Sequence, residues 1–284
     1  MHTNEVFKNK TVLSFEVFPP KDSLTVDAID KIIVQLNELC PDFISVTCGA
    51  NGNGGKNTVQ IASLIKNKYK RESVAHLPGI NITKDEVKQI LYELQANNIE
   101  NILALRGDRG EQAAYKTDFK YASDLVAFVK ENSDFNIIGA CYPEGHIEAK
   151  SKSADIKNLK YKVDAGINQL ISQLFFDNNY FYSFIERAES MNINVPIEAG
   201  IMPVTSKKQI ERMVTLCGAT LPRKFQRVIA RYESDPVALR DAGIAYAVDQ
   251  IVDLLAHGVD GIHIYTMNNP YIAATISNSI RSLL

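Results

Sequence analysis

The chain has 284 residues, a formal net charge of −2, 45% hydrophobic residues and 23% charged residues. This length is typical of one large domain, and the composition is typical of a globular protein rather than a disordered or collagen-like one. Acidic and basic residues are intermixed, so the sequence has no basic stripe for a phosphate backbone. Nucleic acid is therefore excluded as an expected partner.

The cysteines and the N-terminus indicate the cellular setting. Four widely spaced cysteines form no C-x-x-C pair, which indicates reduced core thiols at Cys40, Cys48, Cys141 and Cys217. The N-terminal segment MHTNEVFKNK is polar, and no apolar run approaches the roughly 18 residues that span a bilayer. We therefore expect a cytoplasmic protein without a membrane partner.

Runs rich in β-branched residues recur along the chain and predict eight strands. They cover residues 12–18, 43–47, 73–80, 101–107, 136–142, 169–176, 195–201 and 261–267. The segments between them carry apolar residues at i, i+3, i+4 and i+7, which predicts amphipathic helices. No linker rich in proline, glycine or serine divides the chain, so residues 1–284 are expected to form a single catalytic domain.

Eight alternating strand and helix units predict an α/β fold, a closed (β/α)8 TIM-type barrel; an open doubly wound sheet is the alternative. The string FPPK follows the first strand and places prolines where a dinucleotide-binding G-x-G-x-x-G motif needs glycines. The stretch 202–260 is longer than one helix needs. We expect a small extra helix near 221–230, between strands 7 and 8, before a long crossover at 236–257.

The carboxyl ends of barrel strands form the active face, so polar residues there are candidate functional residues. Glu16 lies inside an apolar strand, and period-two geometry points it into the lumen together with Ser14 and Phe18. Desolvation raises the pKa of a buried carboxyl group, which can then act as a general acid. A paired structural glutamate is the alternative.

Other strand ends offer weaker signals. The string Arg106-Gly107-Asp108 ends the fourth strand, but it can equally form a surface ion pair. The loop GANGNGG could bind an anion through its backbone N–H groups or be merely a flexible loop. No histidine pattern indicates a catalytic metal, and no G-x-S-x-G motif indicates acyl chemistry. One inward acid surrounded by aromatic and neutral polar groups suits a flat cofactor that carries the chemistry.

Several strings occur together in one order along the chain. They are SFEVFPPK, FISVTCGANG, AHLPGIN, NILALRGD, ACYPEGH, DIKNLKYKVDAGINQLISQLFFD, GIMPV and GIHIYTMN. Together they resemble the methylenetetrahydrofolate reductase family from the first strand to the last. The resemblance implies a flavoprotein oxidoreductase of one-carbon metabolism and methionine biosynthesis.

The activity implied by the resemblance is ping-pong through FAD. Hydride from NADH or NADPH passes to the flavin, and 5,10-methylenetetrahydrofolate is then reduced to 5-methyltetrahydrofolate. By motif, Glu16 corresponds to the acid that helps open the folate's imidazolidine ring. Asp108 corresponds to a carboxylate near flavin and pterin, whose charge supports the developing iminium cation.

The resemblance also carries over a flavin-binding set. Its members are Thr47, Cys48, Gly49, Ala50, His76, Arg106, Gly107, Asp108, Tyr121, Ala122, Ala140, Tyr142, His146, Ala149, Asp155, Asn158, Tyr161 and Lys162. The side chains of His146, Tyr161 and Lys162 can meet diphosphate or ribose oxygens, and Asp155 suits a ribose hydroxyl. A solvated helix face is the alternative for Tyr161 and Lys162.

The implied substrate contacts are Glu16, Asp108, Gln173, Gln209, Met213, Tyr265 and Asn269. Many family members carry an aromatic residue at the position of Met213 and an arginine at that of Asn269, where it holds the folate's glutamate tail. Cys48 also replaces a common tyrosine. Because asparagine cannot form a bidentate guanidinium contact, we expect Lys207, Lys208 or Arg281 to hold the tail.

The chain ends after the eighth barrel unit, so we expect no regulatory domain that senses S-adenosylmethionine. A homo-oligomer is also expected. The altered residues Met213 and Asn269 leave a second function open, a flavin- or folate-binding subunit of a larger complex without independent nucleotide oxidation. A third alternative, another flavin barrel such as proline dehydrogenase, fits the strings around Glu16 and Gln173 less well.

Overall fold

A computed structural model describes residues 1–19, 26–48, 54–107 and 118–284. Eight parallel strands close into a barrel in chain order, with β8 pairing with β1. The strands are β1 (Val12–Val17), β2 (Phe43–Val46), β3 (Glu72–Pro78), β4 (Asn101–Leu105), β5 (Asn136–Cys141), β6 (Gln169–Ser172), β7 (Ile197–Ile201) and β8 (Gly261–Tyr265). The predicted barrel and all eight predicted strands are confirmed.

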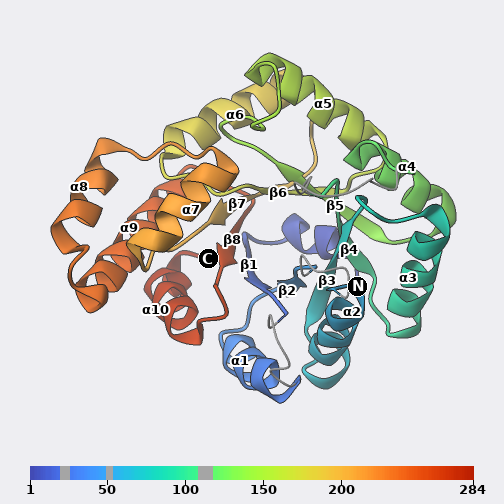
Figure 1. Ribbon diagram of the computed structural model, residues 1–284, viewed down its shortest axis with the longest axis horizontal. Helices are drawn as coiled ribbons and strands as arrows, with labels where there is room; N and C mark the ends of the chain where they lie inside the picture. Colours follow the sequence, from blue (N-terminus) through green and yellow to red (C-terminus); the bar gives the residue numbers. More distant parts are fainter. Residues whose placement is uncertain (20–25, 49–53, 108–117) are drawn as a thin grey trace.

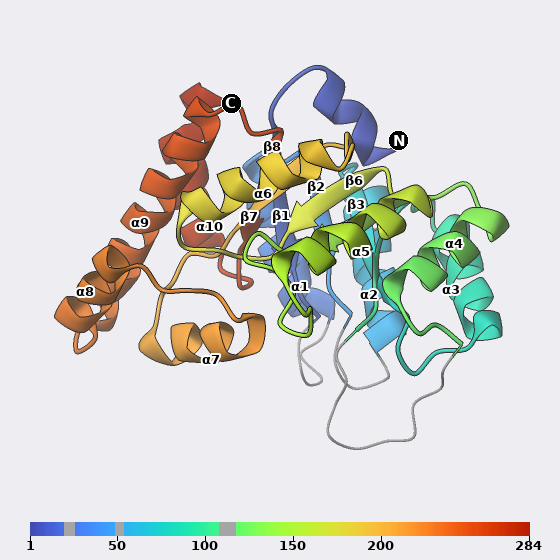
Figure 2. The same ribbon diagram turned by 90° about the horizontal axis from the view of Figure 1, so that it is seen from above.

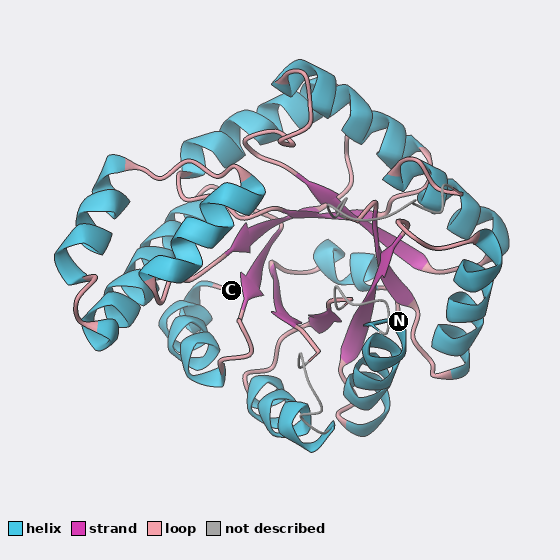
Figure 3. Ribbon diagram, viewed as in Figure 1, coloured by secondary structure: helices cyan, strands magenta, loops and turns pink. Residues whose placement is uncertain are grey.

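Helices surround the barrel (Figures 1 and 3). They are α1 (Val26–Glu38), α2 (Gly54–Ser63), α3 (Lys84–Ala96), α4 (Ala122–Asn132), α5 (Lys152–Asp164), α6 (Asn178–Ser190), α7 (Lys207–Cys217), α8 (Arg223–Tyr232), α9 (Pro236–Ala256) and α10 (Pro270–Ile280). Short helical segments are η1 (Thr3–Lys8), η2 (Leu64–Lys68) and η3 (Arg281–Leu283). No helix in the described part of the chain is long and apolar enough to span a membrane.

Alternate residues of each strand face the lumen or the helices. One residue from each of six strands forms a buried apolar layer in the lumen: Val12, Phe43, Val74, Leu103, Ile138 and Ile171. Leu13 and Phe15 face outward and pack in the main core beneath the helices. Ser14 and Glu16 therefore share the lumen side, as predicted, whereas Phe18 lies beyond the end of β1.

The segment η1 closes the amino end of the barrel. Thr3 is fully buried, and its backbone N–H donates to Oδ1 of Asn101 at 2.9 Å. The Thr3 hydroxyl donates to Oε1 of Gln169 at 2.8 Å and accepts from Nδ2 of Asn136 at 2.9 Å. Three strands are thus joined to η1 at the end of the barrel opposite α7 (Figure 2).

The connection from β7 to β8 differs partly from the prediction. The extra helix is present as α8, and the long crossover is α9. A further helix, α7, precedes them and was not predicted. Its N-cap Ser206 accepts from the backbone N–H of Gln209, and its C-cap Gly218 has a φ of 68°. Together α7 and α8 cover a second apolar cluster that includes Phe176, Val204 and Phe225.

The cysteine prediction is correct in part. All four cysteines are free thiols, but Cys141 alone is buried, whereas Cys48 and Cys217 are half-buried and Cys40 is exposed. Burial raises the pKa of the Cys141 thiol to about 12. Cys40 adopts a φ of 57° at the turn that follows α1. Its place in that turn explains why it lies outside the core.

Candidate active site

Glu16 lies near the carboxyl end of β1, in register with Ser45 of β2 and Tyr265 of β8. Its side chain is 17% exposed, so the carboxylate lies at the inner mouth of the lumen. Oε2 of Glu16 is 3.5 Å from Nε2 of His76 and 3.9 Å from Nε2 of His263. Two imidazole groups on opposite sides of β1 therefore face one carboxylate.

The two imidazole nitrogens beside Glu16 are unusual for buried polar atoms. Among the described residues, neither Nε2 of His76 nor Nε2 of His263 has a hydrogen-bond partner. Burial lowers the pKa of His76 to about 4, although the Glu16 carboxylate opposes that shift. His76 is therefore a neutral group at physiological pH.

Two polar residues of the β8–α10 loop hold the backbone around Glu16, and the sequence reasoning did not identify either. The Thr266 hydroxyl donates to the backbone carbonyl of Glu16 at 2.7 Å. Asn268 accepts from the N–H of Phe18 at 3.0 Å and donates to its carbonyl at 2.8 Å. The string TMNN is only a weak sequence signal of a turn. In the structure Met267 and Asn268 both adopt a positive φ.

A polar row lies deeper in the lumen. The Ser14 hydroxyl is 2.5 Å from Oε1 of Glu198 and 2.6 Å from Nδ1 of His263. Nε2 of Gln169 donates to Oε2 of Glu198 at 2.7 Å. Burial raises the pKa of Glu198 to about 7, with His263, Ser14 and Gln169 opposing the shift. The sequence reasoning assigned no role to Glu198, which lies near the amino end of β7.

Tyr265 and Gln173 lie on the far side of the mouth from β3. The Tyr265 hydroxyl donates to the backbone carbonyl of Ser172 at 2.7 Å. A Cβ on Gly200 would lie 2.8 Å from that hydroxyl, so glycine leaves the space that the ring fills. Oε1 of Gln173 accepts from the N–H of Leu174 at 2.8 Å. Burial raises the pKa of Tyr265 well above its ordinary value, so its hydroxyl stays protonated.

At the end of β4, Arg106 forms a bidentate ion pair with Glu148, with N···O distances of 2.6 and 2.7 Å. Gly107 follows with a φ of 87°, and a Cβ there would lie 2.5 Å from Ile80. The turn that follows Arg106 therefore requires glycine. Asp108, one of the two predicted catalytic residues, lies outside the described residues, as do Gly49 and Ala50 of the predicted flavin-binding set.

Several predicted cofactor residues gather at the end of β5 and along α5. The Tyr142 and His146 rings pack edge to face at 4.7 Å. The Lys162 ammonium donates to the backbone carbonyl of Ala140. Burial raises the pKa of Asp155 and lowers that of Lys162, although each charge favours the other's ionised form. Both side chains are half-buried, so a cation and an acid line this part of the mouth.

The remaining predicted cofactor residues are less closely gathered. Thr47 accepts through its carbonyl from Thr58, and neighbouring Cys48 is half-buried. Tyr121 and Tyr161 are 54% and 68% exposed. Those that remain are half-buried Ala122 and Ala149 and exposed Asn158. Tyr161 therefore lies on a solvated helix face. Lys162, in contrast, turns toward the barrel.

The predicted substrate contacts on α7 and α10 lie at the active face. Oε1 of Gln209 accepts from the Thr205 hydroxyl, and its buried Nε2 has no partner among the described residues. Met213 packs against the second apolar cluster, which α7 and α8 cover. Asn269 caps α10 by accepting from the N–H of Ile272 at 3.3 Å. Its side chain therefore supports the helix start.

The candidates for holding a substrate tail separate by position. Lys207 begins α7 at the active face and pairs with Glu233 at 2.6 Å. Lys208 follows it on the same helix. Arg281 follows α10, near the C-terminus, which lies at the same end as η1 (Figure 2). The suggestion that Arg281 holds a tail is therefore wrong, because α10 carries it away from the mouth.

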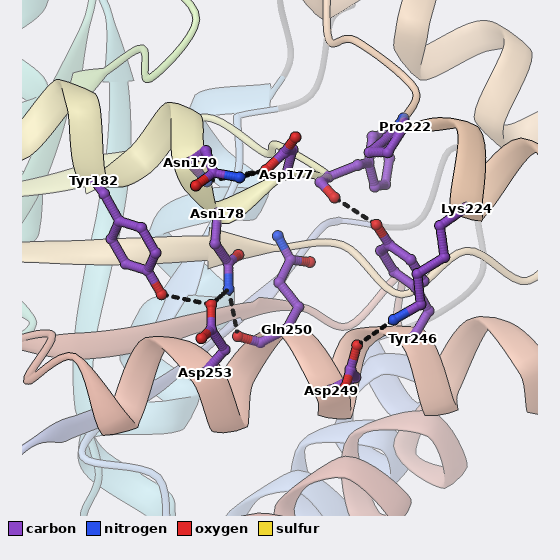
Figure 4. Close-up of a pocket in the computed structure, with 11 residues that line it drawn as sticks. Asp177, Asn178, Asn179, Tyr182, Pro222, Lys224, Tyr246, Asp249, Gln250 and Asp253 are labelled. Carbon is purple, nitrogen blue, oxygen red and sulfur yellow. Dashed lines mark hydrogen bonds and ion pairs between the residues drawn. The ribbon is translucent and has the colours of Figure 1, made fainter.

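A polar groove of about 410 Å³ lies outside the barrel between α6, α8 and α9 (Figure 4). Its walls include Tyr182 and Tyr246, and two hydrogen bonds hold Tyr182 and Asn178 to Asp253. None of the described site residues predicted from the sequence lines this groove. It is therefore separate from the mouth of the barrel.

Comparison with known proteins identifies similar chains. Residues 2–281 match a family model described as methylenetetrahydrofolate reductase. The 5,10-methylenetetrahydrofolate reductase of Pectobacterium carotovorum is 36% identical over 94% of this chain and 89% of that protein. The enzyme of that name from Escherichia coli is 37% identical over 94% and 90%. Methylenetetrahydrofolate reductase (NADH) 1 of Arabidopsis thaliana is 33% identical over 92% of this chain and 47% of that protein.

Solved structures give a likeness of fold. One is a Clostridium thermocellum protein described as binding two copies of 5-methyl-5,6,7,8-tetrahydrofolic acid. Its superposition covers 100% of this chain and 100% of that chain, with a TM-score of 0.63 and 14% identity. Another is tryptophan synthase from M. tuberculosis, whose superposition covers 99% of each chain, with a TM-score of 0.58 and 13% identity. At these identities the likeness shows the barrel fold alone.

Proposed function

Because the chain belongs to the methylenetetrahydrofolate reductase family, we propose that it reduces 5,10-methylenetetrahydrofolate to 5-methyltetrahydrofolate, with bound FAD and with NADH or NADPH as reductant. The observation that carries this proposal is the place of Glu16. Its carboxylate lies at the inner mouth of the barrel between His76 and His263, where a substrate can reach it. Bound FAD would carry hydride from the nucleotide to the folate.

The residues at the mouth fit a flavin with a diphosphate. Among the described residues, the half-buried Lys162 ammonium contacts the Ala140 carbonyl and forms no ion pair with a carboxylate. A cation held in this way suits a phosphate oxygen, because both charges would be compensated. Arg106, His146 and Asp155 add a guanidinium, an imidazole and a ribose acceptor on the same side of the mouth.

Glu16 would act as the general acid of the folate step. Its Oε2 proton would pass to the ring nitrogen of the folate as the C–N bond of the imidazolidine ring breaks. The other ring nitrogen then forms an iminium, which accepts hydride at carbon. Thr266 and Asn268 fix the backbone on either side of Glu16, so the carboxyl group keeps its position during proton transfer.

The remaining contacts would orient the folate. Nε2 of Gln209 is a buried donor without a described partner, which suits a carbonyl or ring nitrogen of the pterin. Gln173 and Tyr265 bring an amide and a protonated hydroxyl from the carboxyl ends of β6 and β8, the strands on either side of β7. Asp108 would supply a negative charge near the developing iminium. Lys207 or Lys208 would take the carboxylates of the glutamate tail.

The test is a pair of half-reactions on the purified protein reconstituted with FAD. NADH or NADPH added without air should bleach the flavin absorbance, and 5,10-methylenetetrahydrofolate should then restore it. Failure to bind FAD would overturn the cofactor assignment. A bound flavin that neither nucleotide bleaches would favour the alternative, a flavin- or folate-binding subunit. We also propose that the protein is a homo-oligomer, which size-exclusion chromatography with light scattering would test.

A further inference from the structure

A continuous row of polar side chains runs down the lumen beneath Glu16. From Oε2 of Glu16, Nε2 of His263 lies at 3.9 Å, and the other nitrogen of that ring is 2.6 Å from the Ser14 hydroxyl. The same hydroxyl lies 2.5 Å from Oε1 of Glu198. The row therefore joins two carboxyl groups through one imidazole and one hydroxyl.

The row is enclosed by the barrel. Ser14, Glu198 and His263 are all fully buried, next to the apolar layer that contains Val12 and Phe43. A Cβ on Gly261 would lie 2.8 Å from Cγ of Glu198, so glycine at this position leaves the space for that carboxyl group. Burying an ionisable group in an apolar lumen is costly unless its partners compensate it.

We propose that Glu198, Ser14 and His263 form a proton relay that returns a proton to Glu16 after Glu16 has protonated the folate. The inference rests on the proposed function, since it requires Glu16 to lose its proton in the folate step. Glu198 and Ser14 act as positioning and relay residues, because neither reaches the mouth where the substrate binds.

The relay step moves one proton and leaves every heavy-atom bond intact. At the start, Glu198 is protonated and donates to Oγ of Ser14, which donates to Nδ1 of His263, while Nε2–H of His263 faces the Glu16 carboxylate. Each hydrogen then passes to its acceptor. At the end, Glu198 is a carboxylate, Ser14 donates to it, Nδ1 carries the imidazole hydrogen, and Glu16 is protonated. The imidazole and the hydroxyl finish neutral, as they began.

This transfer favours the forward reaction. A Glu16 carboxylate left beside the opened ring can take its proton back, and the ring closes again. Protonating Glu16 from below removes that base while the folate still separates the mouth from solvent. The 3.9 Å gap between His263 and Glu16 is closed by a small side-chain rotation or by one bridging water.

The groups that face the relay are consistent with a proton store at Glu198. Gln169 of β6 donates to its second oxygen, and Asp42, before β2, adds a negative charge that Lys10 partly balances at 2.9 Å. At the upper end, His76 of β3 and Tyr265 of β8 face Glu16 as neutral groups. The pKa of about 7 for Glu198 means that it can hold or release a proton near neutrality.

The lumen offers a matched control. Ser45 of β2 is fully buried, pairs in register with Glu16 and carries a hydroxyl without a described partner, but it is outside the row. Ser45→Ala therefore removes the same atom as Ser14→Ala from an equally buried serine, one layer nearer the mouth. Glu198→Gln keeps the shape and both hydrogen-bonding partners of Glu198 but cannot release a carboxyl proton.

The experiment measures reoxidation of the reduced FAD enzyme by 5,10-methylenetetrahydrofolate in a rapid-mixing instrument, from about pH 6 to about pH 8.5. We expect Glu198→Gln and Ser14→Ala each to lower this rate about tenfold, part of the roughly 10²–10⁴-fold that general acid catalysis supplies. The double variant should lose no more than either single variant, because both interrupt one path. The decline of the wild-type rate above about pH 7 should disappear in Glu198→Gln.

Three results would overturn the relay: wild-type rates and pH profiles in both single variants, losses that multiply in the double variant, or an equal loss in Ser45→Ala. Any of these leaves the reductase function in place, because the wild-type enzyme is still reoxidised by the folate. Absence of that wild-type reoxidation would instead overturn the proposed function, and the relay with it.

Discussion

The hydroxyl of Thr266 donates to the backbone carbonyl of Glu16 at 2.7 Å, which ties the loop after β8 to the strand that carries the candidate acid. The bond crosses from one end of the chain to the other, since the two residues are 250 positions apart. It makes the position of Glu16 depend on the closure of the barrel between β8 and β1.

Replacing Thr266 with valine should slow the folate step. Valine keeps the shape but leaves the Glu16 carbonyl without this donor, a loss of about 1 kcal/mol. We expect the rate of flavin reoxidation by folate to fall several-fold, with little change in the dissociation constant of FAD. Thr275→Val is the control, because its hydroxyl bonds only within the exposed face of α10. Equal rates in both variants would contradict a positioning role for Thr266.

Gly200→Ala should destabilise the barrel strongly. The added Cβ would lie 2.1 Å from the backbone carbonyl of Ser172 and 2.8 Å from the Tyr265 hydroxyl, so backbone or ring must move. We expect a loss of about 2 kcal/mol or more in the free energy of unfolding. Gly258→Ala is the comparison, because its Cβ meets no atom within 4 Å and its φ of 77° costs about 1 kcal/mol. Denaturant unfolding that ranks Gly258→Ala as the more damaging change would refute the packing role of Gly200.

Lys162→Met should weaken FAD binding without destabilising the flavin-free protein. A charged hydrogen bond to phosphate is worth about 1.5–3 kcal/mol, so the dissociation constant should rise roughly 10- to 100-fold. The flavin-free variant should unfold at the same or a higher temperature, because the half-buried ammonium has no carboxylate partner among the described ion pairs. The control is Lys160→Met on the same helix, whose lysine pairs with Asp164. Flavin fluorescence titration that shows no difference between the variants would remove Lys162 from the binding set.

Glu198 should make stability depend on pH with a defined sign. Its pKa is raised from 4.5 to about 7, so between these values the folded state binds more protons than the unfolded state. Its contribution is therefore complete below about pH 4.5 and lost as pH rises through about 7, a change of about 3 kcal/mol. Glu198→Gln has no such loss, so its melting temperature should rise relative to wild type between pH 5 and pH 8. A constant difference across that range would contradict the raised pKa.

Local patterns were sufficient for most of the fold. Period-two alternation correctly placed Ser14 and Glu16 in the lumen, because one strand parity faces inward throughout a closed barrel. The helix α7 was missed because the stretch after β7 was interpreted as a single long crossover with one extra helix. The sequence does carry local signals for this helix. Ser206 is its N-cap, and Gly218 ends it with a positive φ that glycine readily adopts.

The contacts within the site could not be derived from local patterns. Ser14 and Glu198 are 184 positions apart, and their contact depends on the register of three strands. The positive φ of Met267 and Asn268, which turns Asn268 back toward Phe18, has no periodic signature. The resemblance gives Asn269 as a substrate contact, and only the structure shows that its side chain caps α10. Side-chain direction at a loop is set by tertiary contacts rather than by spacing.

The central claim is that Glu16 is the acid of the folate step, and Glu16→Gln tests it most directly when both half-reactions are measured on one preparation. Flavin bleaching by NADH or NADPH needs no acid at this position, whereas ring opening does. We predict that reoxidation by 5,10-methylenetetrahydrofolate falls at least about 100-fold, while bleaching changes little. Glu131→Gln, on the exposed face of α4, should leave both rates as in wild type. An equal loss of both half-reactions in Glu16→Gln, or unchanged folate reduction, would contradict the assigned role.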